Sequence, residues 1–183
     1  MSESEIQLLE LLKRRSFRRG EFRLASGDES NYYIDGKMTE VFSEGAYLIG
    51  EVIYEQTKGL NIDAIGGLET GAIPLTTAAV LSYHLHGKPM EGFWVRDKIK
   101  DHGTQKVIEG NLKQGARVVI IEDVVTKGSS AIKAIEAVRK AGCEVMLVLA
   151  LVDRKRGADA LFRSHDINCY QAIFSIQDFG VEE

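Results

Sequence analysis

The chain contains 183 residues, of which 44% are hydrophobic and 27% charged, an ordinary composition for a soluble globular protein with one sizeable core. Its formal net charge of −4 gives no support to a nucleic-acid partner held by bulk charge, so an anion would have to bind at a local basic cluster. Cys143 and Cys169 lack the spacing of a metal site, and neither a signal peptide nor a long apolar run is evident. We therefore expect a cytoplasmic protein with reduced thiols and no membrane segment.

The N-terminal region predicts two helices with an aromatic strand between them. Residues 2–5 form a capping box for a first helix, and its apolar face then comes from Ile6, Leu8, Leu9, Leu11 and Leu12. Residues 32–34 have the pattern of a strand, and the residues alone favour an aromatic hairpin that lies on the core. Ser43 is expected to cap a second helix that ends near Gly59.

A short buried strand is predicted at residues 62–66, and a glycine-rich turn follows it at residues 67–74. Glycines directly after a strand allow backbone N–H groups to approach a ligand closely, and Pro74 suits the first turn of the next helix. The pattern fits a ligand-binding loop, but an ordinary strand-to-helix turn explains any single residue here equally well.

The segment from Arg96 to Lys106 is basic and follows a predicted strand at residues 92–95. It carries four basic residues, His102 and a glycine, with few apolar anchors. Charge runs of this kind are usually solvated surface loops. A loop that leaves directly from a buried strand can also reach a neighbouring site, so both interpretations stay open.

Residues 117–130 contain the strongest local signal in the chain. The run of β-branched residues from Val118 to Ile121 lacks alternation, which is typical of a strand buried on both faces of a parallel sheet. Glu122 and Asp123 end this strand, a small-residue turn follows, and a helix is expected from about residue 131 to 141. The turn and the helix N-terminus can hold a phosphate, and the two carboxylates can accept hydrogen bonds from ribose hydroxyls. The sequence of the turn fits neither the P-loop nor the dinucleotide fingerprint.

Another buried strand is predicted at residues 144–152, and a basic triplet, Arg154, Lys155 and Arg156, follows its end. Arg154 can bind a carboxylate through two parallel hydrogen bonds, although a surface turn explains the triplet as well. A last strand is expected from Cys169 to Ile176. These buried strands and their helices indicate an α/β protein with a central, mostly parallel sheet flanked by helices.

Residues 119–130, Val-Ile-Ile-Glu-Asp-Val-Val-Thr-Lys-Gly-Ser-Ser, resemble the phosphoribosyl diphosphate (PRPP) signature of type I phosphoribosyltransferases. Residues 22–35 are similar to the N-terminal motif of the orotate phosphoribosyltransferases within that family, and residues 96–103 resemble their catalytic loop. Val-Asp-Arg at residues 152–154 resembles the segment that holds the carboxylate of orotate. The resemblance implies a single phosphoribosyltransferase domain at residues 1–183, with a small hood over the base contributed mainly by about residues 1–40.

The resemblance also implies the site residues. The catalytic residues would be Lys100, His102 and Asp123. PRPP would be bound by Thr70, Gly71, Arg96, Lys100, His102, Glu122, Asp123, Val124, Val125, Thr126, Lys127, Gly128, Ser129 and Ser130. Orotate would be bound by Tyr33, Ile34, Thr126 and Arg154. Mg²⁺ would be the cofactor, held mainly by PRPP and not directly by protein ligands. The protein would be a homodimer in which the mobile loop 97–108 acts in the partner's site.

Two alternatives stay open, and three departures from the family pattern support the first of them. Many members have lysine where this chain has Ala25 and Asp97, and some have lysine near Gly71. A regulator that senses PRPP without turnover would explain these losses. A phosphoribosyltransferase for a purine or for uracil is the second alternative, and the aromatic hood motif and Arg154 argue against it.

Overall fold

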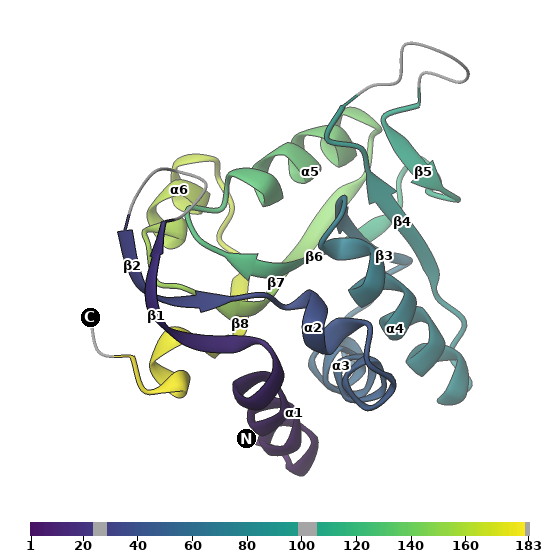
Figure 1. Cartoon of the computed structure of the whole chain (residues 1–183). Coiled ribbons are helices and arrows are strands. Elements are labelled where there is room, and N and C mark those ends of the chain that lie inside the picture. The colour runs from purple at the N-terminus through teal and green to yellow at the C-terminus, as the bar shows by residue number, and fades with distance from the viewer. Residues whose placement is uncertain (24–28, 99–105, 182–183) are drawn as a thin grey trace.

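The computed structural model describes residues 1–23, 29–98 and 106–181 of the chain. Its centre is a six-stranded sheet with the order β5-β4-β3-β6-β7-β8 (Figure 1). The strands are β3 (Ala64–Leu68), β4 (Glu91–Val95), β5 (Ile108–Gly110), β6 (Arg117–Val125), β7 (Glu144–Asp153) and β8 (Tyr170–Ser175). All neighbouring pairs are parallel except β4–β5, so the predicted mostly parallel sheet is confirmed.

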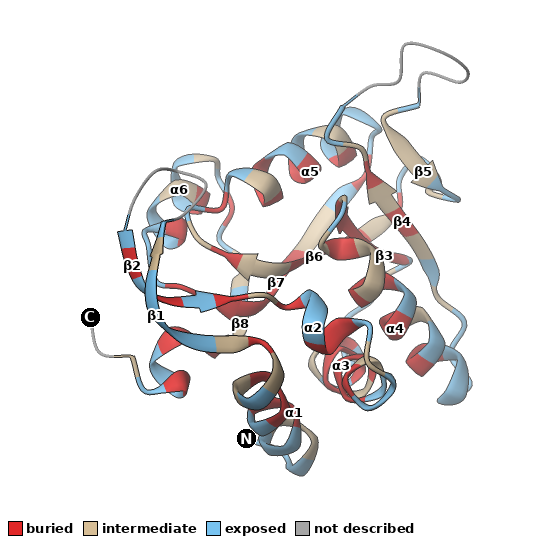
Figure 2. Ribbon diagram, in the orientation of Figure 1, coloured by how far each residue is buried: buried red, intermediate tan, exposed pale blue. Residues whose placement is uncertain are grey.

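Helices cover both faces of this sheet. One face carries α1 (Glu3–Arg15), α3 (Ser43–Thr57) and α4 (Ala72–Leu85), while α5 (Ser129–Lys140) and α6 (Ala158–Ser164) cover the other. Val119 and Ile121 of β6 pack with the first helical layer, and Val118 and Ile120 pack with the second. All four side chains are fully buried, and Figure 2 shows the same burial along the neighbouring strands. This is why β6 lacks a polar face, as the uninterrupted run of β-branched residues predicts.

A separate hairpin precedes the central sheet. Strands β1 (Phe17–Arg23) and β2 (Glu29–Ile34) pair antiparallel and form a two-stranded sheet of their own (Figure 1). Burial alternates along β2, so every second side chain faces the body of the protein. A short helix, α2 (Lys37–Glu40), then leads back to the sheet. The hairpin and α2 therefore place residues 29–40 beside the carboxyl ends of the central strands.

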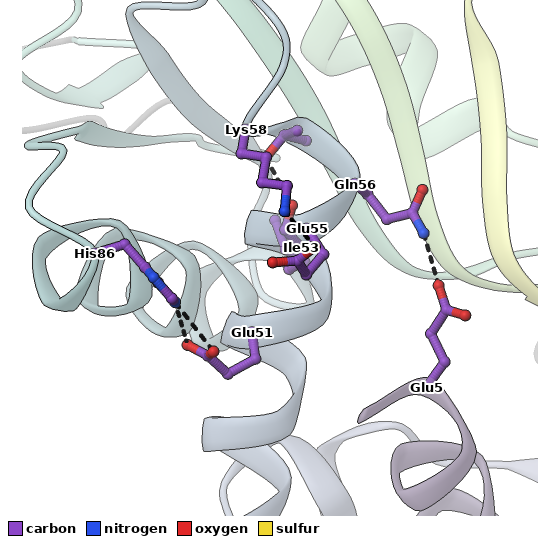
Figure 3. A network of polar contacts seen from close by, with 8 residues as sticks. Glu5, Glu51, Ile53, Glu55, Gln56, Lys58 and His86 are labelled. Carbon is purple, nitrogen blue, oxygen red and sulfur yellow. Dashed lines mark hydrogen bonds and ion pairs between the residues drawn. The ribbon is translucent and has the colours of Figure 1, made fainter. Parts of the chain in front are cut away.

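Polar contacts join the three helices of the first layer (Figure 3). His86, after α4, lies 3.1 Å from the Glu51 carboxylate of α3, and its ring stacks on Tyr54 at 4.0 Å. Gln56 of α3 donates to Glu5 of α1 at 2.7 Å. Partial burial opposes ionisation of Glu51, but hydrogen bonds from Ser82 and His86 outweigh it and lower the pKa of that carboxyl.

Several predicted boundaries are confirmed and others are wrong. The capping box at Ser2 and Glu5 begins α1 as expected. Ser43 does not cap α3, because it is already the first helical residue and Phe42 takes the cap position. Helix α5 begins at Ser129, two residues earlier than predicted. Among the described residues, no helix combines the length and the apolar character needed to cross a membrane.

Candidate active site

The strand order reverses between β3 and β6, and this reversal decides where a ligand can bind. From β3 the chain continues outward to β4, whereas from β6 it continues in the opposite direction to β7 and β8. The connections after β3 and β6 therefore diverge, and the carboxyl ends of these two strands border a crevice. The turn after β3 holds Thr70 and Gly71, and the turn after β6 holds Thr126 to Gly128. Two segments that the sequence predicts to bind one ligand are thus brought together.

Asp123 is the meeting point of three segments of the site. Its Oδ1 accepts a hydrogen bond from the Val124 N–H at 2.8 Å, and its Oδ2 lies 3.1 Å from Lys37 Nζ. A side chain at Gly71 would begin 2.5 Å from Asp123 Oδ1, so the turn after β3 approaches this carboxylate closely. Asp123 is mostly buried, and both of its oxygens are held in defined positions.

Glu122 lies deeper than Asp123. It is 8% exposed, and its Oε2 has no hydrogen-bond partner among the described residues. Burial, and to a lesser extent the charge of Asp123, raises the pKa of Glu122 to about 8. At neutral pH this carboxyl is therefore mostly protonated and can donate a hydrogen bond as well as accept one.

Two residues that sequence reasoning did not single out complete this cluster. Lys37 of α2 pairs with Asp123, and Glu40, one turn later, is 3% exposed with neither carboxyl oxygen hydrogen-bonded within the described ranges. Gly36 packs so closely on Glu40 Oε1 that a side chain there would collide with it. Burial, followed by the charge of Asp123, raises the pKa of Glu40 to about 8. No three His, Cys, Asp or Glu side chains of the described chain are arranged to hold a metal ion.

The turn from Thr126 to Ser130 leads directly into the N-terminus of α5. Gly128 takes the cap position with φ +86°, and no side chain of the described residues caps this helix start. A β-carbon at Gly128 would also lie 2.8 Å from the ring of Phe162 in α6. Glycine is therefore needed here for backbone conformation and for space. The N-terminal amides of a 12-residue helix, with Ser129 and Ser130 beside them, suit a phosphate group.

The other predicted PRPP-binding residues near this turn differ in their exposure and in their hydrogen bonds. The Val124 N–H is occupied by Asp123, and the fully buried Val125 accepts a backbone hydrogen bond from Arg154 at 2.9 Å. Lys127 is exposed at the tip of the turn. Thr70 is exposed after a cis peptide bond that joins it to Glu69.

Arg154 is a buried guanidinium that the hairpin holds in place. It is 7% exposed, its Nε donates to the Tyr32 hydroxyl at 3.1 Å, and its Nη2 donates to the Ser30 hydroxyl at 3.3 Å. The guanidinium also lies 4.7 Å from the centre of the Tyr32 ring. Within the described ranges no carboxylate pairs with it, so it carries a buried positive charge beside the crevice. An anionic group of a ligand, such as a carboxylate, would bind this charge strongly.

The two predicted hairpin residues lie on opposite faces of β2. Ile34 is buried on the same face as Tyr32, whereas Tyr33 is 42% exposed and packs on Phe22 with ring centres 5.5 Å apart. Sequence reasoning missed Tyr32 and Ser30. The alternation of β2 is the signal that could have found them, because Ser30, Tyr32 and Ile34 share one face.

The basic loop is described only at its two ends. Arg96 donates from Nε and Nη2 to Glu109 Oε1 at 2.8 and 2.7 Å. Asp97 accepts from Lys133 of α5 at 2.7 Å, and this hydrogen bond lowers the pKa of Asp97. The predicted loop range 97–108 runs one residue into β5, where Ile108 pairs with Val95. Lys100 and His102, and also Ala25 in the hood, lie outside the described residues.

The comparisons with known proteins agree with this geometry. The model of the phosphoribosyl transferase domain matches residues 40–183. A relative named orotate phosphoribosyltransferase, from Bradyrhizobium diazoefficiens, is 45% identical, and the match covers 97% of each chain. The chain belongs to the orotate phosphoribosyltransferase family. A further member of the family, from Aquifex aeolicus, is 41% identical over 94% of this chain and 95% of its own length.

Solved structures confirm the fold of this orotate phosphoribosyltransferase family member. The crystal structure of Mycobacterium tuberculosis orotate phosphoribosyltransferase in complex with PRPP superposes with a TM-score of 0.81 at 33% identity. The alignment covers 97% of this chain and 99% of that one. The type I phosphoribosyltransferase fold expected from the resemblance is therefore correct.

Proposed function

We propose that the chain transfers the phosphoribosyl group of PRPP to N1 of orotate, giving orotidine 5′-monophosphate and diphosphate in de novo UMP synthesis. The choice of orotate as the base rests on one observation. Arg154 carries a buried guanidinium, and its backbone N–H donates to Val125 at the end of β6. The proposed phosphate-binding turn follows that strand directly. Orotate differs from uracil by a carboxylate, and Arg154 offers that carboxylate a charged partner.

In the proposed complex, the 5′-phosphate of PRPP lies on the turn from Thr126 to Ser130 and at the start of α5. Asp123 accepts a hydrogen bond from a ribose hydroxyl, and Glu122, protonated at neutral pH, either donates to a second hydroxyl or accepts from it. The backbone of Val124 and Val125 and the side chain of Lys127 border the same turn. Thr70 and Gly71 face the diphosphate from the turn after β3.

Orotate would lie between the hairpin and the PRPP site. Its carboxylate would bind Arg154, whose orientation is fixed by Tyr32 and Ser30. Ile34 shares the face of β2 that carries Tyr32 and Ser30, and Thr126 is the first residue beyond the β6 strand. Tyr33 faces away from Arg154 in the described structure, so its proposed contact with the base would come from the outer side of β2. The hairpin, within about residues 1–40, would act as the hood over the base.

The reaction requires no covalent nucleophile. N1 of orotate attacks C1 of the ribose as the bond to diphosphate breaks, and positive charge develops on the ribose ring. The negative charge of Asp123 favours that developing charge, and the leaving diphosphate must be met by positive groups. Mg²⁺, which prefers phosphate oxygens and water, would arrive with PRPP and neutralise part of the diphosphate charge. Arg96, Lys100 and His102 are the protein groups proposed to bind the rest, and Arg96 would have to leave Glu109 to do so.

We propose a cytoplasmic homodimer in which loop 97–108 closes over the partner's site. Large apolar side chains that are exposed on α4 and around the α2–α3 junction support an interface between copies; they are Met38, Val41, Tyr47, Leu81 and Leu85. Loop closure would also exclude water, which otherwise hydrolyses PRPP.

The decisive experiment follows the absorbance of orotate after PRPP and Mg²⁺ are added to the purified protein. Uracil, hypoxanthine and adenine are run in parallel, and Arg154→Gln is the matched variant. Consumption of orotate alone, lost in the variant while PRPP binding by calorimetry persists, is the expected result. Turnover of another base would overturn the assignment of substrate. PRPP binding without turnover of any base would favour the PRPP-sensing regulator.

A further inference from the structure

Lys37 lies beside Asp123 in the site but has no role in the reaction proposed above. Its Nζ lies 3.1 Å from Asp123 Oδ2, and its side chain remains 51% exposed. An ammonium group has three donors, and the contact with Asp123 uses one of them. With respect to the residues that the structure describes, two N–H donors therefore remain available on the solvent side of Asp123.

The surroundings of Lys37 keep it charged and hold its backbone in place. Burial of the stem opposes the charge, but Asp123, with smaller contributions from Glu40 and Asp35, outweighs this and raises the pKa of Lys37. The Lys37 N–H also donates to Asp35 Oδ1 at 3.3 Å, and the Glu40 N–H donates to Gly36 O at 3.0 Å. The ammonium is thus presented from a short helix whose position is set by its own hydrogen bonds.

The position of Asp123 indicates that Lys37 lies near the diphosphate of PRPP. Lys37 reaches this carboxylate at Oδ2, and Gly71, on the turn proposed to face the diphosphate, approaches it at Oδ1. In PRPP the diphosphate is attached to the carbon next to the one that bears the 2-hydroxyl. A cation that touches the carboxylate bound to the ribose hydroxyls is therefore within a side chain's reach of the diphosphate oxygens.

We propose that Lys37 is a further substrate-binding residue, whose ammonium bridges Asp123 and a diphosphate oxygen of PRPP. This inference rests on the proposed function. Lysine binds phosphate groups as a point charge and needs no planar match. The contact supplies a positive charge on the leaving group from the hood side of the site, within the same chain that carries Asp123.

The test compares Lys37→Met with Lys58→Met. Lys58 is a matched control, because it also pairs with a carboxylate, Glu55 at 2.6 Å, and its side chain is 46% exposed. Calorimetry in the presence of Mg²⁺ measures the Kd of PRPP and, separately, of inorganic diphosphate. Loss of one charge-assisted hydrogen bond should weaken both ligands roughly tenfold to a hundredfold in Lys37→Met. Lys37→Arg should recover part of the loss, and Lys58→Met should bind as the wild type does.

Inorganic diphosphate separates direct contact from an effect through Asp123, since it has no ribose hydroxyls. Weaker binding of PRPP with unchanged binding of diphosphate would mean that Lys37 only positions Asp123, and the proposal would be wrong. Unchanged binding of both ligands would also overturn it. If the wild type binds neither PRPP nor diphosphate, the proposed function itself fails, and that outcome is distinct from the other two.

Discussion

The buried carboxyl of Glu40 makes the stability of this protein depend on pH in a defined direction. The pKa of Glu40 rises from its ordinary value of 4.5 to about 8 on folding, because burial disfavours the charged form. Between these values the folded state keeps a proton that the unfolded state has lost. Stability therefore falls as pH rises from about 4.5 to about 8, by up to about 1.36 kcal/mol per pH unit. From pH 5 to pH 7 the loss due to Glu40 amounts to about 2 to 3 kcal/mol.

Glu40→Gln removes this titration and leaves the shape of the side chain nearly unchanged. We expect the free energy of unfolding of the variant, relative to that of the wild type, to increase by about 2 to 3 kcal/mol from pH 5 to pH 7. Glu122, whose pKa is also raised to about 8, is present in both proteins, so its effect is largely removed by the comparison. Glu10→Gln, at a well-exposed position of α1, is the control and should show no such trend.

Urea denaturation at pH 5, 6, 7 and 8, followed by the fluorescence of the single tryptophan, Trp94, measures the difference directly. A difference that stays constant over this range would mean that Glu40 ionises normally in the folded protein. A variant that becomes relatively less stable at pH 8 would mean that the ionised carboxylate has a stabilising partner. Either result would refute the reasoning.

Three substitutions test other contacts of the site. Gly71→Ala should lower kcat/KM for PRPP roughly tenfold, because its methyl group displaces the Asp123 carboxylate; Gly59→Ala, in open space, should not. Tyr32→Phe should raise the KM for orotate about fivefold while the KM for PRPP stays constant, since only the hydrogen bond to Arg154 is lost; an equal change in both would argue against the orotate site. Gly128→Ala should lower the melting temperature more than Gly157→Ala, because both have positive φ but only Gly128 is packed against Phe162; equal losses would show that φ alone matters.

The parts of the site that the sequence predicted are those whose signals are local. The β-branched run of β6, the acidic pair at its end and the small-residue turn follow one another along the chain. Strand burial, carboxyl-end placement and helix start are consequences of adjacent residues. The capping box at Ser2 and Glu5 is local in the same way, and the structure confirms it.

The parts that sequence reasoning missed depend on contacts between distant segments. Lys37 and Asp123 are 86 residues apart, and nothing near Lys37 indicates which carboxylate it meets. Glu40 was missed because a glutamate three residues after a lysine usually lies on a solvated helix face, whereas here α2 turns it inward. Tyr32, which faces Arg154, was missed because its side depends on the phase of a strand, and one residue of phase moves every side chain to the other face. Strand β5 was missed because three residues are too few for a periodic pattern.

A backbone hydrogen bond holds the two ends of the basic loop together. The Arg96 N–H donates to the Val107 carbonyl at 2.8 Å, so the chain leaves and rejoins the sheet at neighbouring positions. Beyond this hydrogen bond, three antiparallel residue pairs join β4 to β5. They hold the two ends of any insert in fixed positions. The entropic cost of closing an insert between two fixed ends grows slowly, by only about 0.6 kcal/mol for each doubling of its length. We therefore expect segments of different length and charge from other family members to be tolerated between residues 97 and 106, so that their effects on turnover can be compared on one scaffold.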